Sequence, residues 1–170
     1  SRRLSDGFQF AASHTWSKLL SNTGADPPYS DFYHRKADWG PAAYDIRHRF
    51  AWHAAWRLPL GPGQRFLNSG PAARIAAGWS FGSIAVLQTG PPFTVLARTD
   101  STGAFPAGPL RADVLGGPGL PAADRSPARW FDASQFSQPR PLAFGNQGVN
   151  ALRGAGLANF DFSILRAFKL

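Results

Sequence analysis

The sequence predicts an all-β protein built from long antiparallel strands, and three observations carry this prediction. Glycine and proline account for 33 of the 170 residues (Gly 18, Pro 15), a share that favours turns and loops over helices. All ten acidic residues are aspartate and only three of the eighteen basic residues are lysine, so the residues that usually cover an exposed helix face are mostly missing. Four segments alternate apolar and polar residues with a period of two, as a strand with two different faces does.

The four predicted strands lie near residues 6–20, 45–58, 78–95 and 159–170. The third is the least regular, and the fourth keeps its alternation apart from Leu165 and Arg166. The second is the clearest, because two sets of residues separate by parity: Ile46, His48, Phe50, Trp52, Ala54, Trp56 and Leu58 on one face, and Arg47, Arg49, Ala51, His53, Ala55 and Arg57 on the other.

The length of these segments predicts a membrane-spanning role. A strand of about twelve residues covers about 40 Å, and a tilt of about 45° leaves about 28 Å, which matches the apolar band of an outer membrane. Strands of water-soluble proteins more often stop at about five or six residues. We therefore expect a segment of an antiparallel transmembrane β-barrel whose apolar face and aromatic belt contact lipid through Phe8, Phe10, Trp16, Phe50, Trp52, Trp56, Trp79, Phe160, Phe162 and Phe168.

The opposite faces of the first two strands are polar and, in the second, regularly basic. Such side chains do not suit a buried sheet, whereas a water-filled lumen accepts them. These residues either line a ligand path or contact a plug, or they only solvate the wall of the lumen. The lumen-facing candidates are Gln9, Ser13, Arg47, Arg49, His53 and Arg57.

The three connections differ in character, and this predicts the orientation. Residues 21–44 are polar and aromatic, residues 59–77 contain a Leu-Gly-Pro-Gly turn, and residues 97–158 form a long stretch rich in proline and glycine. Periplasmic turns of outer-membrane barrels are short and extracellular loops are long. Segments 21–44 and 97–158 are therefore expected outside the cell, and segment 59–77 in the periplasm.

Catalytic and metal-binding patterns are not found in the sequence. His48 and His53 fall on opposite faces of one strand, and a chain without glutamate has no His-Glu zinc motif. No Gly-x-Ser-x-Gly elbow occurs, and the glycine-rich stretches 116–119 and 153–156 lack the strand-then-helix setting of a phosphate loop. We expect no catalytic residue, metal or cofactor, and a protein that is not an enzyme.

The formal net charge of +8 does not indicate a nucleic-acid partner, because the arginines are spread along the chain without a Lys/Arg block. The sequence contains no run of eighteen apolar residues, so it predicts no transmembrane helix. Residues 1–6 do not have the basic-then-apolar pattern of a signal peptide.

Several short motifs, taken in order, resemble the β-barrel of Oar-like TonB-dependent outer-membrane receptors. The resemblance covers nearly the whole chain, and the joint spacing of the motifs is more specific than any one of them. The motifs are TWSK (15–18), DIRHRF (45–50), LPLG (58–61), RFLN (65–68), GW (78–79), QTGPPFT (88–94), WFD (130–132), FGN (144–146) and NALRGAGLANFD (150–161).

The resemblance implies a larger monomeric barrel in the outer membrane of a Gram-negative bacterium, closed around an N-terminal plug and importing a ligand with energy passed through TonB. Residues 1–170 would be part of the barrel domain, with the plug and the signal peptide outside them. The implied partners are outer-membrane lipid, the remaining barrel and plug, TonB and an unidentified ligand. Four strands about 4.8 Å apart cannot close a barrel, so the segment is an incomplete barrel.

The sequence leaves two hypotheses from other classes of protein open. A soluble β-sandwich binding module would stay in solution without detergent. A secreted hydrolase would lose its activity on substitution of His48 or His53.

Overall fold

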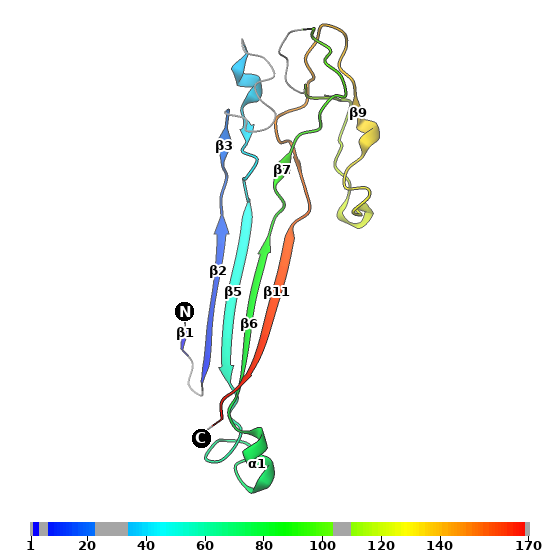
Figure 1. The fold of residues 1–170 in the computed structure, drawn as a ribbon. Coiled ribbons are helices and arrows are strands. Elements are labelled where there is room, and N and C mark those ends of the chain that lie inside the picture. The colour runs from blue at the N-terminus through cyan, green and yellow to red at the C-terminus, as the bar shows by residue number, and fades with distance from the viewer. Residues whose placement is uncertain (1, 4–6, 23–33, 104–109, 169–170) are drawn as a thin grey trace. The chain divides into compact units, whose positions relative to one another are not determined.

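The computed structural model describes residues 2–3, 7–22, 34–103 and 110–168, and of Arg2 and Arg3 the backbone alone. The chain divides into two compact units (Figure 1). The first, here called the sheet unit, comprises residues 1–15, 48–88 and 157–170. The second, the loop unit, comprises residues 16–47 and 89–156.

The sheet unit contains one open sheet with the strand order β1-β2-β5-β6-β11. Its four long strands have nine or ten residues, a length that crosses a bilayer when the strand is tilted. The all-β, antiparallel prediction is confirmed, and the sheet is an incomplete barrel because its order does not close. The strands are β1 (Arg2–Arg3), β2 (Phe8–Trp16), β5 (His48–Arg57), β6 (Trp79–Gln88) and β11 (Leu157–Arg166).

Strand ends differ from the expected ranges for local chemical reasons. β5 begins at His48 rather than near residue 45, because Asp45 is engaged by side chains of the loop unit. β6 ends at Gln88 rather than near residue 95, ahead of Pro91 and Pro92, which have no N–H to donate to a ladder.

The register of the sheet separates an apolar face from a polar one, since residues paired across antiparallel strands lie on the same side. Trp52 pairs with Ala85, which pairs with Phe160 on the other side of β6. The neighbouring row, on the opposite face, joins His53, Ile84 and Asp161. We call these the apolar face and the polar face of the sheet.

A short helix, α1 (Gly70–Ala76), lies in the connection between β5 and β6, where the sequence predicts a turn alone. The segment after Pro71 is rich in alanine, which favours helix, but its seven residues are too few to show a helical period. Ala73 is fully buried. Gly61 has a φ of +109°, and a Cβ there would lie 2.6 Å from the Cβ of Ala77, so the turn packs tightly against the end of the helix.

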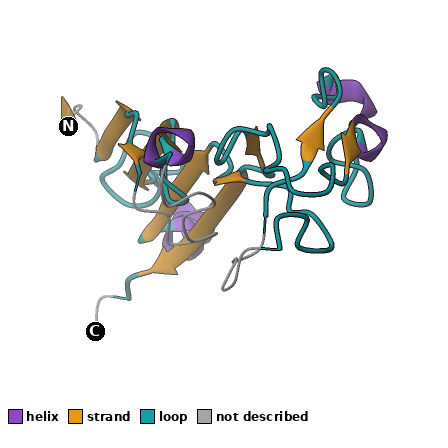
Figure 2. Cartoon of the chain, turned by 90° about the horizontal axis from the view of Figure 1, so that it is seen from above, coloured by secondary structure: helices purple, strands orange, loops and turns teal. Residues whose placement is uncertain are grey.

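The loop unit is mostly irregular and contains only short elements in its described residues (Figure 2). Three two-stranded ribbons pair β3 with β4, β7 with β10, and β8 with β9. None of the helices in the described residues has the length and apolar character of a membrane span. The elements are β3 (Leu20–Ser21), β4 (Gly40–Pro41), β7 (Pro92–Phe93), β8 (Asp113–Val114), β9 (Phe136–Ser137), β10 (Leu152–Arg153) and the 3-10 turns η1 (Arg35–Asp38), η2 (Ala122–Asp124) and η3 (Ala133–Gln135).

Candidate functional site

The polar face carries three of the predicted lumen residues on β5. Arg49, His53 and Arg57 share this face, and the register adds Asn159 and Asp161 from β11. The side-chain amide of Asn159 donates a 2.7 Å hydrogen bond to the Asp161 carboxylate. The face is therefore polar and carries charges of both signs.

A shallow depression of about 760 Å³ lies over the middle of the polar face. Small residues form its floor, and Gly82 is one of them because a Cβ there would lie 2.5 Å from the hydroxyl of Ser163. Ser13 of β2 lines this depression, whereas Gln9 precedes it on the same strand. The polar-face residues around the depression are Ala11, Ser13, Ala51, His53, Ala55, Gly82, Ile84, Val86, Asp161 and Ser163.

The residues expected to contact lipid include exposed aromatic side chains of the apolar face. Trp52, Trp56, Phe160 and Phe162 are all exposed, and the rings of Phe162 and Phe81 stack with their centres 6.0 Å apart. Phe8 and Phe10 line a second shallow depression with Trp52, Phe81 and Phe162. Phe50 pairs with Leu87, while Trp79, Trp16 and Phe168 lie at strand ends.

Arg47 is the predicted lumen residue that the structure places outside the strand. It precedes β5 and belongs to the loop unit, where its Nη2 atom lies 3.5 Å from the Oδ2 atom of Asp45. Its position therefore follows the chemistry of Asp45 rather than the alternation of β5.

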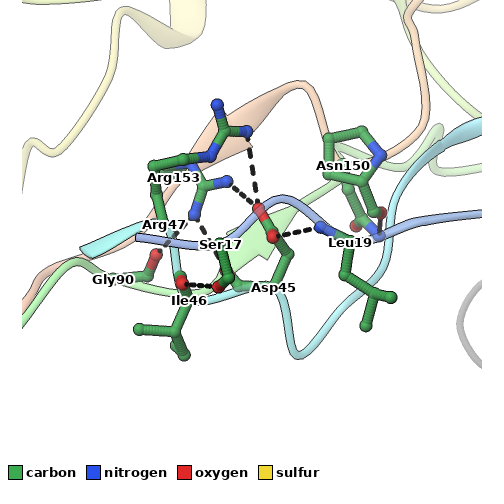
Figure 3. A network of polar contacts seen from close by, with 9 residues as sticks. Ser17, Leu19, Asp45, Ile46, Arg47, Gly90, Asn150 and Arg153 are labelled. Atoms are coloured by element: carbon green, nitrogen blue, oxygen red, sulfur yellow. Dashed lines mark hydrogen bonds and ion pairs between the residues drawn. The ribbon is translucent and has the colours of Figure 1, made fainter. Parts of the chain in front are cut away.

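Asp45 is the centre of a polar cluster in the loop unit (Figure 3). The residue is 1% exposed, and its Oδ1 atom accepts a 2.7 Å hydrogen bond from the backbone N–H of Leu19. Its Oδ2 atom accepts a hydrogen bond from Arg153 in an ion pair. Arg153 also donates to the backbone carbonyls of Asp45, at 2.9 Å, and Gly90, at 3.2 Å. Every strong acceptor of the buried aspartate thus has a donor.

The cluster fixes the acid in its charged form. Burial alone would raise the pKa of Asp45, but the N–H of Leu19 and the guanidinium groups of Arg153 and Arg47 hold the pKa of that carboxyl below its ordinary value of 3.8. The carboxylate is therefore ionised at neutral pH, and its ion pairs are present there.

Ser17 ties the chain just after the first long strand to the same cluster. Its hydroxyl donates a 2.7 Å hydrogen bond to the carbonyl of Ile46, and its N–H donates a 3.1 Å bond to the carbonyl of Arg47. These two bonds join the start of the β2–β5 connection to its end. Arg153 joins this connection to the β6–β11 connection.

Asn150 makes a second link between the two connections. Its side-chain amide donates a 2.7 Å hydrogen bond to the carbonyl of Pro41, and its N–H donates a 2.8 Å bond to the hydroxyl of Thr94. The residue has a φ of +51°, a conformation that asparagine tolerates better than most residues.

A third link is an ion pair between Arg111 and Asp38, each 4% exposed. The Nε atom of Arg111 and the amide nitrogen of Gln147 are buried without a hydrogen-bond partner in the described residues. The three links make one folded unit from two connections that lie far apart in the sequence.

This cluster is not predicted from the sequence, although its residues lie in two of the motifs. Segments 45–50 and 150–161 carry the family resemblance, yet nothing in them specifies that Asp45 and Arg153, 108 positions apart, form a pair. Compensating charges in two motifs were a signal that could have suggested it.

The described residues form no group of three or more side chains that could hold a metal ion.

His14 and His48 stack with their ring centres 5.5 Å apart, and the Nε2 atom of His14 lies 3.2 Å from the Nδ1 atom of His48. By strand parity both belong to the apolar face. The sheet unit thus has one face of exposed aromatic side chains and one polar face, and buried polar contacts hold the loop unit together.

Comparison with known proteins gives one match. A family model described as an outer membrane beta barrel domain matches residues 1–170. No curated protein and no solved structure matches the chain. The matched residues include every long strand of the sheet unit and both connections of the loop unit.

Proposed function

The chain belongs to the outer membrane β-barrel domain family, and from this premise we propose that it forms part of the barrel of an Oar-like, TonB-dependent receptor that takes up a ligand. The family places the protein in the outer membrane of Gram-negative bacteria. Uptake and its coupling to TonB are the proposal, and the order of the sequence motifs supports them.

The observation that carries the proposal is the two-faced sheet. The side chains of Trp52, Phe160 and Phe162 are exposed on one face, as lipid contact requires. Arg49, His53 and Asp161 stand on the other, as a wet lumen requires. A soluble β-sandwich would cover the first face with a second sheet, and the family match selects the membrane instead.

The loop unit supports a receptor rather than a passive wall. Its two connections are cross-linked by buried polar contacts around Asp45, Asn150 and Arg111, so they present a fixed surface. A fixed surface loses little conformational entropy when it binds a ligand. We assign ligand capture to this unit and passage to the polar face, without a catalytic step.

The partners in this proposal are outer-membrane lipid on the apolar face, the remaining barrel and plug at the sheet edges, TonB, and an imported ligand of unidentified class. No nucleic acid is among them, since the arginines of the chain are dispersed and several are used in ion pairs.

A capture experiment tests the coupling without knowledge of the ligand. The immobilised periplasmic domain of TonB is incubated with the detergent-solubilised full-length protein, and a general porin serves as the control. We expect capture of the full-length protein and none of the porin. Failure to capture it would overturn the TonB-dependent assignment and leave the barrel intact.

A transport assay then identifies the ligand class. Ferric siderophores, maltodextrins and short peptides, each radiolabelled, are offered to cells with and without the receptor and with and without TonB. We expect accumulation of one class that needs both proteins. Accumulation that needs the receptor and persists without TonB would indicate a passive channel.

A further inference from the structure

The connection between β5 and β6 exposes large apolar side chains. Ile75 of α1 is 68% exposed, and Phe66 and Leu67 of the preceding turn are each more than half exposed. Phe168, just after β11, is 72% exposed. These residues belong to one compact unit with the sheet, and α1 lies at the end of β5 and β6 (Figure 1).

Contacts attach α1 to the last row of the apolar face. The indole N–H of Trp79 donates a 3.2 Å hydrogen bond to the carbonyl of Ile75. Arg166 pairs with Trp79 in the β6–β11 ladder, and its guanidinium lies 5.5 Å from the Trp79 ring centre and 4.6 Å from that of Phe168. The same guanidinium donates a 3.1 Å bond to the carbonyl of Arg74.

The backbone holds this arrangement closely. Gly78 has a φ of +82°, and a Cβ there would clash with the carbonyl oxygen of Ala167. The N–H of Ala167 donates a 2.9 Å hydrogen bond to the carbonyl of Gly78. The C-terminal end of α1 is therefore held against the last row of the apolar face, next to Trp79 and Arg166.

The charge of this surface is positive. Residues 58–78 contain Arg65 and Arg74 and no acidic residue. Within the part of the chain that the structure describes, the ion pairs involve other arginines, and no carboxylate lies within 4 Å of Arg65, Arg74 or Arg166. An apolar surface edged by uncompensated arginines is complementary to the interface of an anionic lipid layer.

We propose that the β5–β6 connection is a membrane-interface anchor that binds anionic phospholipid of the periplasmic leaflet. Ile75 and Phe168 enter the boundary between headgroups and acyl chains, Trp79 lies at headgroup level, and Arg74 pairs with lipid phosphate. The periplasmic leaflet is the one concerned because this connection is shorter than the β2–β5 and β6–β11 connections, and periplasmic turns are the shorter ones. The inference rests on the barrel and not on TonB coupling.

Site-directed spin labelling tests the depth of the anchor. The chain contains no cysteine, so single cysteines are introduced by Ile75→Cys, Ile164→Cys and Arg57→Cys in the full-length protein, reconstituted in vesicles of phosphatidylethanolamine and phosphatidylglycerol at about 3:1. Ile164 reports the apolar face and Arg57 the polar face. We expect oxygen to relax the labels at 164 and 75 more than a water-soluble nickel complex does, and the reverse at 57.

The outcomes separate two failures. A label at 75 that is as accessible to nickel as the label at 57, beside a lipid-buried label at 164, would overturn the anchor and leave the barrel standing. A label at 164 that is itself in water would overturn the lipid-facing assignment of the whole face.

A quenching experiment tests the choice of lipid. A fluorophore attached to the thiol of the Ile75→Cys variant is quenched by brominated phosphatidylglycerol and, separately, by brominated phosphatidylcholine at the same mole fraction. We expect stronger quenching by the anionic lipid. Adding Arg74→Gln should lower the ratio of quenching by phosphatidylglycerol to quenching by phosphatidylcholine by up to about fivefold. An equal response to the two lipids, or a preference unchanged by Arg74→Gln, would contradict the phosphate contact. Arg98→Gln, an exposed arginine of the loop unit, is the matched control.

Discussion

Arg153 donates hydrogen bonds to both the carboxylate and the backbone carbonyl of Asp45, although 108 positions separate the two residues. A buried aspartate that loses such a partner keeps its desolvation cost without compensation. The pair is therefore one of the three links that hold the two connections of the loop unit together.

Substitution of Arg153 by methionine should open the loop unit. The change leaves Asp45 with the Leu19 N–H and a 3.5 Å contact to Arg47, and we expect a loss of about 3 kcal/mol, at the lower end for breaking a buried pair because Arg153 is partly exposed. Hydrogen exchange of residues 17–22 in the full-length protein measures it. Arg98→Met, in an exposed position of the same unit, is the control, and equal exchange in the two variants would show that the pair adds nothing.

Low pH should open the same unit. The pKa of Asp45 is lower in the folded protein than its ordinary value of 3.8. As the pH falls, Asp45 therefore binds a proton in the unfolded state before it does so in the folded state. The stabilisation is complete above about that value and is lost as the pH falls through the lower pKa of the folded state. Pepsin cleavage of the loop unit should accelerate below about pH 4 in the wild type relative to Asp45→Asn, which has no such carboxylate to titrate. Identical pH profiles for the two proteins would refute this assignment.

Gly90 should not accept a side chain. A Cβ at this position would clash with the carbonyl oxygen of Gly154, so the crossing of the β7 and β10 segments must move apart, at a cost of about 1–3 kcal/mol. Gly117→Ala is a matched control because nothing lies within 4 Å of a Cβ there. The melting temperature of the full-length protein should fall for Gly90→Ala and not for Gly117→Ala. The same melting temperature for both would mean that the crossing is looser than described.

The same added charge should lower the stability of the protein much more on the apolar face of β11 than on its polar face. Phe160 lies on the apolar face and Asn159 on the polar face, and both are exposed. Phe160→Lys should cost about 2–4 kcal/mol if the residue lies near the bilayer midplane, and Asn159→Lys should cost little. Urea unfolding in lipid vesicles measures both. A larger loss in Asn159→Lys than in Phe160→Lys would reverse the facing of the sheet.

The strands were predictable because their information is local. Alternation assigns each residue of 45–58 and 159–170 to a face, and the ladders keep these assignments for residues 49–57 and 159–166, including Leu165 and Arg166 as the two exceptions. The overall antiparallel, incomplete barrel followed from the same pattern, and the family match confirms it. That the polar-face residues line a ligand path stays a prediction.

The loop unit was not predictable because its contacts are distant in sequence. The opposite charges of the two motifs do not specify that Asp45 pairs with Arg153, and nothing near Asp38 indicates Arg111, 73 positions away. Alternation alone assigned Arg47 to the lumen, whereas its guanidinium lies beside Asp45. Helix α1 was missed since seven residues do not establish a period.

The side chains of Arg153 and Asn150 reach from one connection into the other, and this has a consequence for engineering and for evolution. A specificity change made by grafting either connection alone into a related barrel would deprive Asp45 of its cation or Asn150 of the Pro41 carbonyl. Recombination that exchanges both connections together conserves these partners. Donor and recipient sequences should therefore be compatible only when the two segments are inherited as a pair.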